Sequence, residues 1–393
     1  MKSKIKAFIK NNKLFYRLYY LIGSFFLRFL GVFIKTDPNL LLFVCYGGRK
    51  FDDSPRVVYE YLQEKPVSKD HRYVWAFTEP EKYPDIKDSV KIDTLSYYIT
   101  ALRAGYWITN SSVSRGLNFK KRATKNILFT HGLTAMKRIG SDVPSSGDAF
   151  VTAFHESFDM VFVEGKKEVP ILSKVWKLPE SVFHMTGLPR NDDLVGATKA
   201  ECDNIKCHLG IPKDKKVILY APTFRDNARS ADGSHALGIP MDLNKWKSVL
   251  GEEYVLLITA HYEVAKLLDS LPDNGFVINA FGYPELNDLL KVADILISDY
   301  SSIVFDYAIL ERPIYCYGYD YEDYLVQRGS YTDINQLFCD GVIRDEETLL
   351  YKIAHIDYDS QCLFTRRYIK EEYIASYGDA ARKSVELIFG AKK

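Results

Sequence analysis

Short runs of apolar residues recur along the chain from residue 40 onward, separated by stretches with helical periodicity. The first set is Leu40–Cys45, Tyr73–Phe77, Tyr106–Thr109, Asn126–Phe129 and Met160–Val163. The second set is Val217–Ala221, Tyr254–Ile258, Phe276–Asn279, Ile295–Ser298 and Ile314–Tyr317. Strands that alternate with helices build parallel sheets with helices on both faces. The pattern predicts an α/β fold with two Rossmann-like, doubly wound parallel-sheet domains that face a cleft.

The chain of 393 residues is long enough for two domains with separate cores and a short appendage. We place the appendage at residues 1–36, the first domain at 37–205 and the second at 206–393. The turn-rich segments Gly187–Asn191 and Gly210–Pro212 bracket the join. The last segment, Arg366–Phe389, reads as helices that either close the second domain or cross back to the first.

The amino-terminal segment is basic, aromatic and amphipathic, with no acidic residue before Asp37. It is too short for a membrane span and Arg28 interrupts its apolar run, while no small-residue cleavage site suggests a secretory signal. We expect a helix that lies in the plane of an anionic membrane surface. The alternative is a helix packed on the protein's own body. The basic residues of the amino-terminal segment are Lys2, Lys4, Lys6, Lys10, Lys13, Arg17, Arg28 and Lys35.

Charge and cysteine content exclude several classes of function. The 52 Lys and Arg residues nearly cancel the 51 Asp and Glu residues, so no global field draws the chain to nucleic acid. The six cysteines lack metal-ligand spacing, and we read them as free thiols in a reducing compartment. No carboxylate cluster demands a metal, and we expect neither a metal nor a cofactor.

The segment from Ile295 to Asp306 reads as a buried strand, a tight turn and a helix. A helix start presents unpaired backbone N–H groups that favour phosphate, and the hydroxyls of Ser301 and Ser302 lie at the same place. Asp306, one turn further, could hold a ribose hydroxyl or orient the turn. The alternative is that Ser301 only caps a core helix and Asp306 is a solvated or turn-bracing acid.

Other predicted strands also end in residues with useful chemistry. His131 follows an apolar run and can accept a proton from a hydroxyl near neutral pH, although a turn histidine bonded to backbone is the plain alternative. Thr223 and Arg225 follow another run, where a guanidinium suits bidentate phosphate contact and a surface arginine is the commoner outcome. His261 ends a third run. Together these groups suit transfer of a phosphate-bearing group from an activated diphosphate to a hydroxyl.

Several segments, in matching order from Leu40 to Asp333, resemble the CDP-glycerol glycerophosphotransferase family of wall teichoic acid synthesis. They are Tyr106–Ser111, His131-Gly132, Gly187–Asp192, Leu219–Asp226, Ile297–Asp306, Glu311–Pro313 and Gly329–Asp333. The resemblance implies a two-Rossmann (GT-B) fold and a peripheral enzyme at the cytoplasmic face of the bacterial membrane. It implies transfer of glycerol phosphate from CDP-glycerol to an undecaprenyl-diphosphate-linked glycan acceptor, with release of CMP.

The resemblance also assigns roles to individual residues and to the two domains. Residues 37–205 would take the acceptor and 206–393 the CDP donor. His131 is the expected general base, and His261 would stabilise the diphosphate or assist departure of CMP. The donor phosphates would contact Arg225, Thr223, Ser301, Ser302 and Asp306. Acceptor or loop candidates are Gly47, Gly48, Asn110 and Arg190; the Gly47-Gly48 pair alone is weak evidence, because it is not the dinucleotide-binding fingerprint.

The sequence also departs from the family pattern. The segment Thr130–Lys137 differs from the usual residues around the first histidine, which leaves donor and acceptor identity open. The absence of a large additional domain favours a primase-like member over a polymerase, on size alone. Two alternatives remain: a CDP-ribitol or capsule polyol-phosphate transferase, and a non-catalytic membrane-associated protein that binds precursors. The presence of both histidines argues against the second, and a homo-oligomer is left open.

Overall fold

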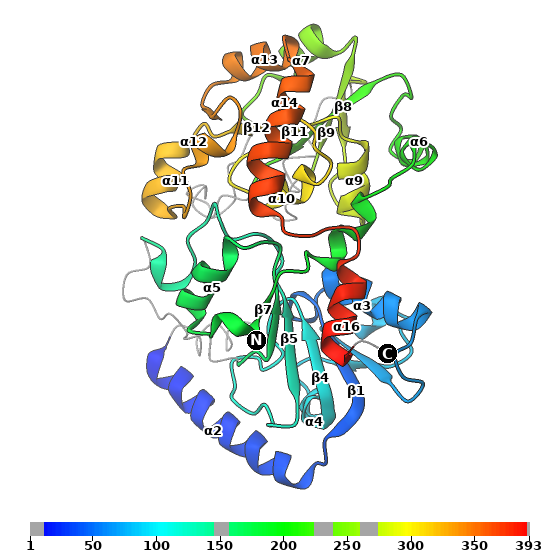
Figure 1. Ribbon diagram of the computed structural model, residues 1–393, viewed down its shortest axis with the longest axis vertical. Helices are drawn as coiled ribbons and strands as arrows, with labels where there is room; N and C mark the ends of the chain where they lie inside the picture. The colour runs from blue at the N-terminus through cyan, green and yellow to red at the C-terminus, as the bar shows by residue number, and fades with distance from the viewer. Residues whose placement is uncertain (1–11, 145–156, 224–238, 260–273, 391–393) are drawn as a thin grey trace. The chain divides into compact units, whose positions relative to one another are not determined.

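The computed structural model describes residues 12–144, 157–223, 239–259 and 274–390 and contains two parallel β-sheets. Each sheet is the centre of one compact unit (Figure 1). Unit 1 comprises the described residues within Met1–His131, Ser146–Asp192 and Asp379–Lys393. Unit 2 comprises those within Gly132–Ser145 and Asp193–Gly378. The predicted α/β class with two parallel sheets is confirmed.

The sheet of unit 1 has seven strands in the order β3-β2-β1-β4-β5-β6-β7, and every neighbouring pair is parallel. The order reverses between β1 and β4, which creates a topological switch point at the carboxyl ends of these two strands. The strands are β1 (Asp37–Val44), β2 (Arg72–Phe77), β3 (Ser89–Lys91), β4 (Ala104–Thr109), β5 (Lys125–Phe129), β6 (Met160–Phe162) and β7 (Phe183–His184).

The sheet of unit 2 has six parallel strands in the order β10-β9-β8-β11-β12-β13, with its own switch point between β8 and β11. All ten predicted strands are present, with ends that differ by at most three residues. The three strands that the sequence pattern missed, β3, β7 and β13, have only two or three residues. The strands of unit 2 are β8 (Lys216–Ala221), β9 (Tyr254–Ile258), β10 (Val277–Asn279), β11 (Ile295–Ser298), β12 (Ile314–Tyr317) and β13 (Val342–Ile343).

Alternate residues of the central strands enter separate cores on the two faces of each sheet. In β1, Leu40 and Leu42 pack on one face of the unit 1 sheet, and Leu41 and Phe43 pack on the other. Unit 2 follows the same rule in β8 and its neighbours. Both faces are therefore apolar, which explains why these strands read as continuous hydrophobic runs.

Helices cover both faces of each sheet. In unit 1, α2 (Lys13–Phe33) and α4 (Leu95–Arg103) pack on one face, and α3 (Asp53–Glu64) and α16 (Ala380–Phe389) pack on the other. α5 (Glu168–Trp176) follows β6. Among the described residues of unit 2, the helices are α6 (Lys199–His208), α7 (Leu243–Leu250), α9 (Leu286–Val292), α10 (Ile303–Ala308), α11 (Tyr321–Gln327), α12 (Ile334–Leu337), α13 (Glu346–Ala354), α14 (Tyr358–Phe364), a π-helix (Thr365–Lys370) and α15 (Glu371–Tyr373).

Two segments belong to a different unit from their neighbours in sequence. Leu133, Ala135 and Met136 are buried in the core of unit 2, so the chain enters unit 2 directly after His131. The last helix, α16, returns to unit 1, where Val385 and Ile388 join the core. The division into units therefore differs from the boundary expected near residue 205, because these buried apolar contacts join residues far apart in sequence. The last segment was expected either to close the second domain or to cross back to the first, and α16 crosses back to the first.

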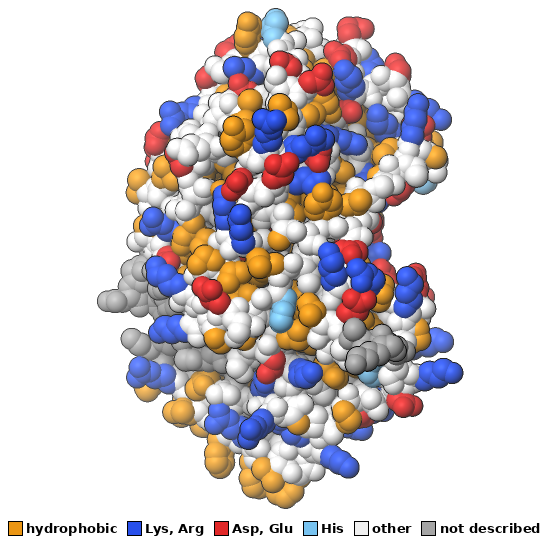
Figure 2. Space-filling view, in the orientation of Figure 1, with side chains coloured by type: hydrophobic (Ala, Val, Ile, Leu, Met, Phe, Trp, Pro, Cys, Tyr) orange, Lys and Arg blue, Asp and Glu red, His pale blue; other side chains and the backbone are white. Residues whose placement is uncertain are grey.

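Helix α2 packs on unit 1 through one face and exposes the other. Leu27 is in the core, Ser24 Oγ accepts a hydrogen bond from Asn118 N–H at 2.9 Å, and Arg28 Nε donates to the Asn118 carbonyl at 2.8 Å. Figure 2 shows hydrophobic side chains along the lower left edge, where α2 lies. The exposed apolar side chains are Leu14, Phe15, Leu18, Tyr19, Leu21, Ile22, Phe25, Phe26, Phe29, Val32 and Phe33. Within the described part of the chain, no helix has the length and apolar character needed to cross a bilayer.

Candidate active site

The carboxyl ends of β1 and β4 meet at the switch point of unit 1, where the Gly47-Gly48 turn follows β1. The turn is a single 3₁₀ turn, Tyr46–Gly48, and both glycines have positive φ. A side chain at Gly48 would lie about 3.0 Å from the carbonyl oxygen of Ala76 and would also collide with Ile92. Gly48 is therefore required for close packing.

The three backbone N–H groups of this turn donate within the protein. Tyr46 N–H donates to Asn110 Oδ1 at 2.7 Å, Gly47 N–H to Ser111 Oγ at 2.9 Å, and Gly48 N–H to the carbonyl of Cys45 at 2.8 Å. A phosphate bound at the turn would have to compete with these bonds. The turn is thus a structural junction between β1 and β4, and the side chains of Asn110 and Ser111 join them.

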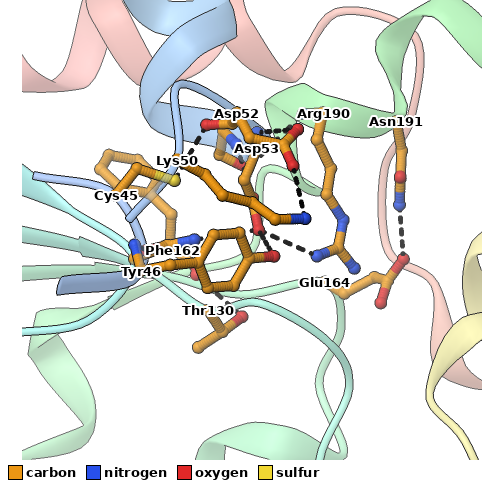
Figure 3. Close-up of polar contacts among 12 residues, drawn as sticks. Cys45, Tyr46, Lys50, Asp52, Asp53, Thr130, Phe162, Glu164, Arg190 and Asn191 are labelled. Atoms are coloured by element: carbon orange, nitrogen blue, oxygen red, sulfur yellow. Dashed lines mark hydrogen bonds and ion pairs between the residues drawn. The ribbon is translucent and has the colours of Figure 1, made fainter. Parts of the chain in front are cut away.

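The carboxylate of Asp53 collects donors from four segments of unit 1 (Figure 3). Its Oδ2 accepts hydrogen bonds from Tyr46 Oη at 2.6 Å, Asn110 Nδ2 at 3.0 Å and Arg190 Nη1 at 3.3 Å. Its Oδ1 accepts one from the backbone N–H of Ser54. The Asp53 side chain is 2% exposed and that of Arg190 is 16% exposed, so this is a buried ion pair with a nearly complete set of hydrogen bonds.

Electrostatics at this cluster keep Asp53 ionised and Tyr46 neutral. Burial by itself would raise the pKa of Asp53, but Arg190 and the hydrogen bonds from Tyr46, Ser54 and Asn110 outweigh it and hold the pKa below its usual value. Burial, with the nearby Asp53 charge, raises the pKa of the Tyr46 phenol well above its ordinary range. Tyr46 is therefore a fixed hydrogen-bond donor to Asp53 at any physiological pH.

The segment Gly187–Asp192 uses its three polar residues to join elements of unit 1. Arg190 binds Asp53, Asn191 Nδ2 donates to Glu164 Oε1 at 3.2 Å, and Asp192 accepts the N–H groups of Ala380 and Ala381 at 2.8 Å each. The last contact caps the start of α16. Arg190, which was expected to contact the acceptor substrate or to lie in a loop, thus lies in the same cluster as Asn110.

His131 lies two residues beyond the carboxyl end of β5, and its side chain is exposed. Thr130, which precedes it, is buried and donates its backbone N–H to the Phe162 carbonyl at 3.0 Å. The imidazole lies edge-on to the Tyr46 ring, with the ring centroids 6.3 Å apart and the planes at 69°. The structure therefore places His131 next to the Asp53 cluster, at the same edge of the sheet.

The switch point of unit 2 is built in the same way. Asp299 follows the last residue of β11 and is buried, and its carboxylate accepts the backbone N–H of Thr223 at 3.0 and 2.9 Å as well as the Thr223 hydroxyl. Thr223 stands two residues after β8, as Tyr46 stands two residues after β1. Asn110 and Asp299 thus occupy equivalent positions in the two units. Each follows the fourth strand of its unit, and its side chain accepts a backbone N–H from the residue that lies two positions after the first strand.

Ser301 and Ser302 lie between β11 and α10 and are half-buried. Ser301 Oγ accepts the N–H of Ile303 at 3.4 Å, and Ser302 occupies the N-cap position without a side-chain capping bond. All six residues of α10 are buried, so it is a core helix. Asp306 is 4% exposed within it, which excludes a solvated surface acid and leaves the ribose-binding and turn-bracing alternatives.

Arg225, expected to bind the donor, and His261, expected to be catalytic, lie outside the described residues. Within the described ranges, no group of three or more His, Cys, Asp or Glu side chains is arranged to hold a metal ion. The sequence reasoning missed Tyr46, Asp53 and Asp299 as members of the switch points. The start of α3 can be predicted from the residues Asp52 to Pro55, which are typical of a helix N-terminus. That pattern does not indicate that the side chain of Asp53 is buried.

Two doubly wound parallel sheets, each with polar residues gathered at its switch point, define an α/β protein with a GT-B-like fold. Residues 25–390 match the sequence profile of the CDP-Glycerol:Poly(glycerophosphate) glycerophosphotransferase family. The chain belongs to this family.

Individual relatives and a solved structure agree with this assignment. The chain is 32% identical over 303 residues to a teichoic acid poly(glycerol phosphate) polymerase of Staphylococcus epidermidis, a match that covers 74% of this chain but only 42% of that protein. A polymerase of the same description from Bacillus spizizenii is 29% identical over 415 residues, covering 99% of this chain and all of that protein. A His-to-Asn variant of the wall teichoic acid polymerase TagF soaked with CDPG has a TM-score of 0.80 and 26% identity, covering 98% of this chain and 97% of that one.

Proposed function

We propose that this chain transfers glycerol phosphate from CDP-glycerol to a hydroxyl group of a membrane lipid-linked glycan in teichoic acid synthesis. The observation that carries the proposal is the match along 98% of the chain to TagF soaked with CDPG, within a family named for the same transfer. The acceptor proposed is an undecaprenyl-diphosphate-linked glycan. The B. spizizenii polymerase is matched over its whole length, so the length of this chain does not favour a primase over a polymerase.

In the proposed reaction, the acceptor hydroxyl oxygen attacks the phosphorus atom that carries glycerol. A new P–O bond forms, the P–O bond to the CMP phosphate breaks, and CMP leaves. His131 takes the proton of the acceptor hydroxyl, a role supported by its exposed position at the carboxyl edge of the unit 1 sheet. A positioned general base contributes typically about 10²- to 10⁴-fold to the rate.

The donor is assigned to unit 2. Arg225 would pair with the diphosphate, and His261 would stabilise it or assist the departure of CMP. The half-buried Ser301 and Ser302 hydroxyls, next to the switch point, support a role in phosphate contact. Thr223 is fixed just after β8 by its hydrogen bonds to Asp299, which supports a place for it beside the proposed phosphate contacts.

The deciding experiment measures CMP release by the purified protein with CDP-glycerol and, separately, with CDP-ribitol, using a lipid-linked or short-chain acceptor. Faster release with CDP-glycerol than with CDP-ribitol supports the proposal, and His131→Ala serves as the inactive control. Preference for CDP-ribitol would assign a different donor within the same family. Absence of CMP release with both donors, from a protein that still binds them, would point to a non-catalytic precursor-binding protein.

The exposed face of α2 supports a second part of the proposal, attachment to the anionic cytoplasmic face of the membrane. Leu14, Leu21, Phe25 and Phe33 are each more than 60% exposed on a helix whose opposite face packs on unit 1. Apolar insertion of such a face gives peripheral attachment. Deletion of α2 is a poor test, because it would uncover the core residue Leu117; substitutions on the exposed face are the better test.

A further inference from the structure

Tyr46 is held in one position from both ends. Its backbone N–H donates to Asn110 Oδ1 at 2.7 Å and its phenol donates to Asp53 Oδ2 at 2.6 Å. Asn110 closes the loop, because its Nδ2 donates to the same Asp53 oxygen at 3.0 Å. Movement of the Tyr46 side chain would therefore break its hydrogen bond to the buried Asp53 carboxylate.

The backbone around this cluster is strained. Tyr46 and Asp53 both adopt the left-handed conformation, with φ of 46° and 59°, although neither is a glycine. Such residues persist where the surroundings fix them, and they gather at functional sites. Here the surroundings are the Asp53–Arg190 ion pair and the two Asn110 contacts.

The ring of Tyr46 faces His131. The two rings meet edge to face with centroids 6.3 Å apart, within the range in which aromatic pairs attract each other. On the exposed side of the cluster, Lys50 places its ammonium 5.7 Å from the centroid of the Tyr46 ring and 3.6 Å from Asp52 (Figure 3). The tyrosine is therefore a rigid surface between a buried ionic cluster and an exposed imidazole.

We propose that Tyr46, locked by Asp53, Asn110 and Arg190, is a positioning residue that fixes the imidazole of His131 for proton transfer. The inference rests on the proposed role of His131 as general base. Misplacement of a catalytic group by about 1 Å can cost on the order of 100-fold in rate. In this proposal, the Asp53 cluster affects His131 through Tyr46.

The kinetic test compares Tyr46→Phe with Tyr97→Phe in the CMP-release assay. Tyr97 is a matched control, because its buried hydroxyl also donates a hydrogen bond, to the Val113 carbonyl beneath α4. Loss of the Tyr46 hydroxyl frees the ring, so kcat should fall about 10-fold or more, with KM for CDP-glycerol nearly unchanged. Tyr97→Phe should leave kcat at the wild-type value. An unchanged kcat in Tyr46→Phe would overturn the proposal.

A double-mutant cycle separates positioning from a general structural effect. In a His131→Ala background there is no imidazole to position, so Tyr46→Phe should leave the residual turnover unchanged. An equal fold-loss in the wild-type and His131→Ala backgrounds would show that Tyr46 acts independently of His131, and the proposal would be wrong.

NMR of histidine Cε1–H groups tests the contact without any assay of activity. The His131 signal is assigned by its loss in His131→Gln and then followed in Tyr46→Phe, Tyr46→Ala and Tyr97→Phe. The two Tyr46 variants should move this signal and Tyr97→Phe should not. If the wild-type protein releases no CMP, the proposed function fails while the NMR arm still decides whether Tyr46 fixes His131; an unmoved signal in both Tyr46 variants refutes it.

Discussion

Replacement of Arg190 by Met should destabilise unit 1 strongly, because it leaves the buried carboxylate of Asp53 without its counter-charge. Removal of one partner of a buried ion pair typically costs about 3–5 kcal/mol. Asp53 would keep three other donors, from Tyr46, Asn110 and Ser54, so the low end of this range applies. We therefore expect a loss of about 3 kcal/mol in the free energy of unfolding of unit 1.

Urea unfolding followed by tryptophan fluorescence provides the assay. Trp246 is the one tryptophan in unit 2, so a Trp246→Phe background lets the remaining three report on unit 1. With a slope of about 2–3 kcal/mol/M, the midpoint should fall by about 1–1.5 M. Arg382→Met, which removes the exposed pairs of this α16 residue with Asp379 and Glu386, is the matched control and should cost under about 1 kcal/mol. Equal midpoint shifts for the two variants would refute the reasoning.

The effect of Arg190→Met should also depend on pH. The folded-state pKa of Asp53 lies below its unfolded value, so its contribution to stability is present above the unfolded pKa of about 3.9. That contribution is lost as pH falls through the folded-state pKa, once the carboxyl is protonated in both states. The stability gap between wild type and Arg190→Met should therefore narrow below about pH 4. A gap that stays constant down to pH 3 would show that packing, not charge, dominates.

The remaining predictions concern activity, donor binding and membrane attachment. His131→Ala should lower turnover about 10²- to 10⁴-fold while calorimetry shows nearly unchanged CDP-glycerol affinity; near-normal turnover would contradict its role as base. Arg225→Lys and Ser302→Ala should each weaken CDP-glycerol binding in calorimetry, since a charge-assisted bond to phosphate is worth roughly 1.5–3 kcal/mol; unchanged affinity in both would place the phosphates elsewhere. Phe25→Glu should release the protein from anionic liposomes in flotation, whereas Leu387→Glu, at an exposed position of α16, should not; flotation of both variants would assign the contact to another surface.

The amino-terminal helix α2 shows what hydrophobic periodicity can predict and what it cannot. The apolar and basic pattern predicts an amphipathic helix. One of its faces packs on unit 1, and attachment of the exposed face to a membrane stays a prediction. Ser24 and Leu27 pack on unit 1, while Phe25 and Phe29 stay exposed. Which stripe turns inward depends on the position of Asn118 and Leu117, which the local pattern does not contain.

The sequence by itself determined the two parallel sheets, because their central strands are buried on both faces and therefore appear as apolar runs bounded by turns. It also determined that His131, Asn110 and Thr223 stand at strand ends, since that is a local property of the chain. Only the tertiary structure decided that Arg190 meets Asp53, 137 residues away, and that α16 returns to unit 1. The same holds for the choice between Asp52 as helix cap and Asp53 as buried anion. These pairings depend on sheet order and chain crossing, which bring distant charges together only after the strands have associated.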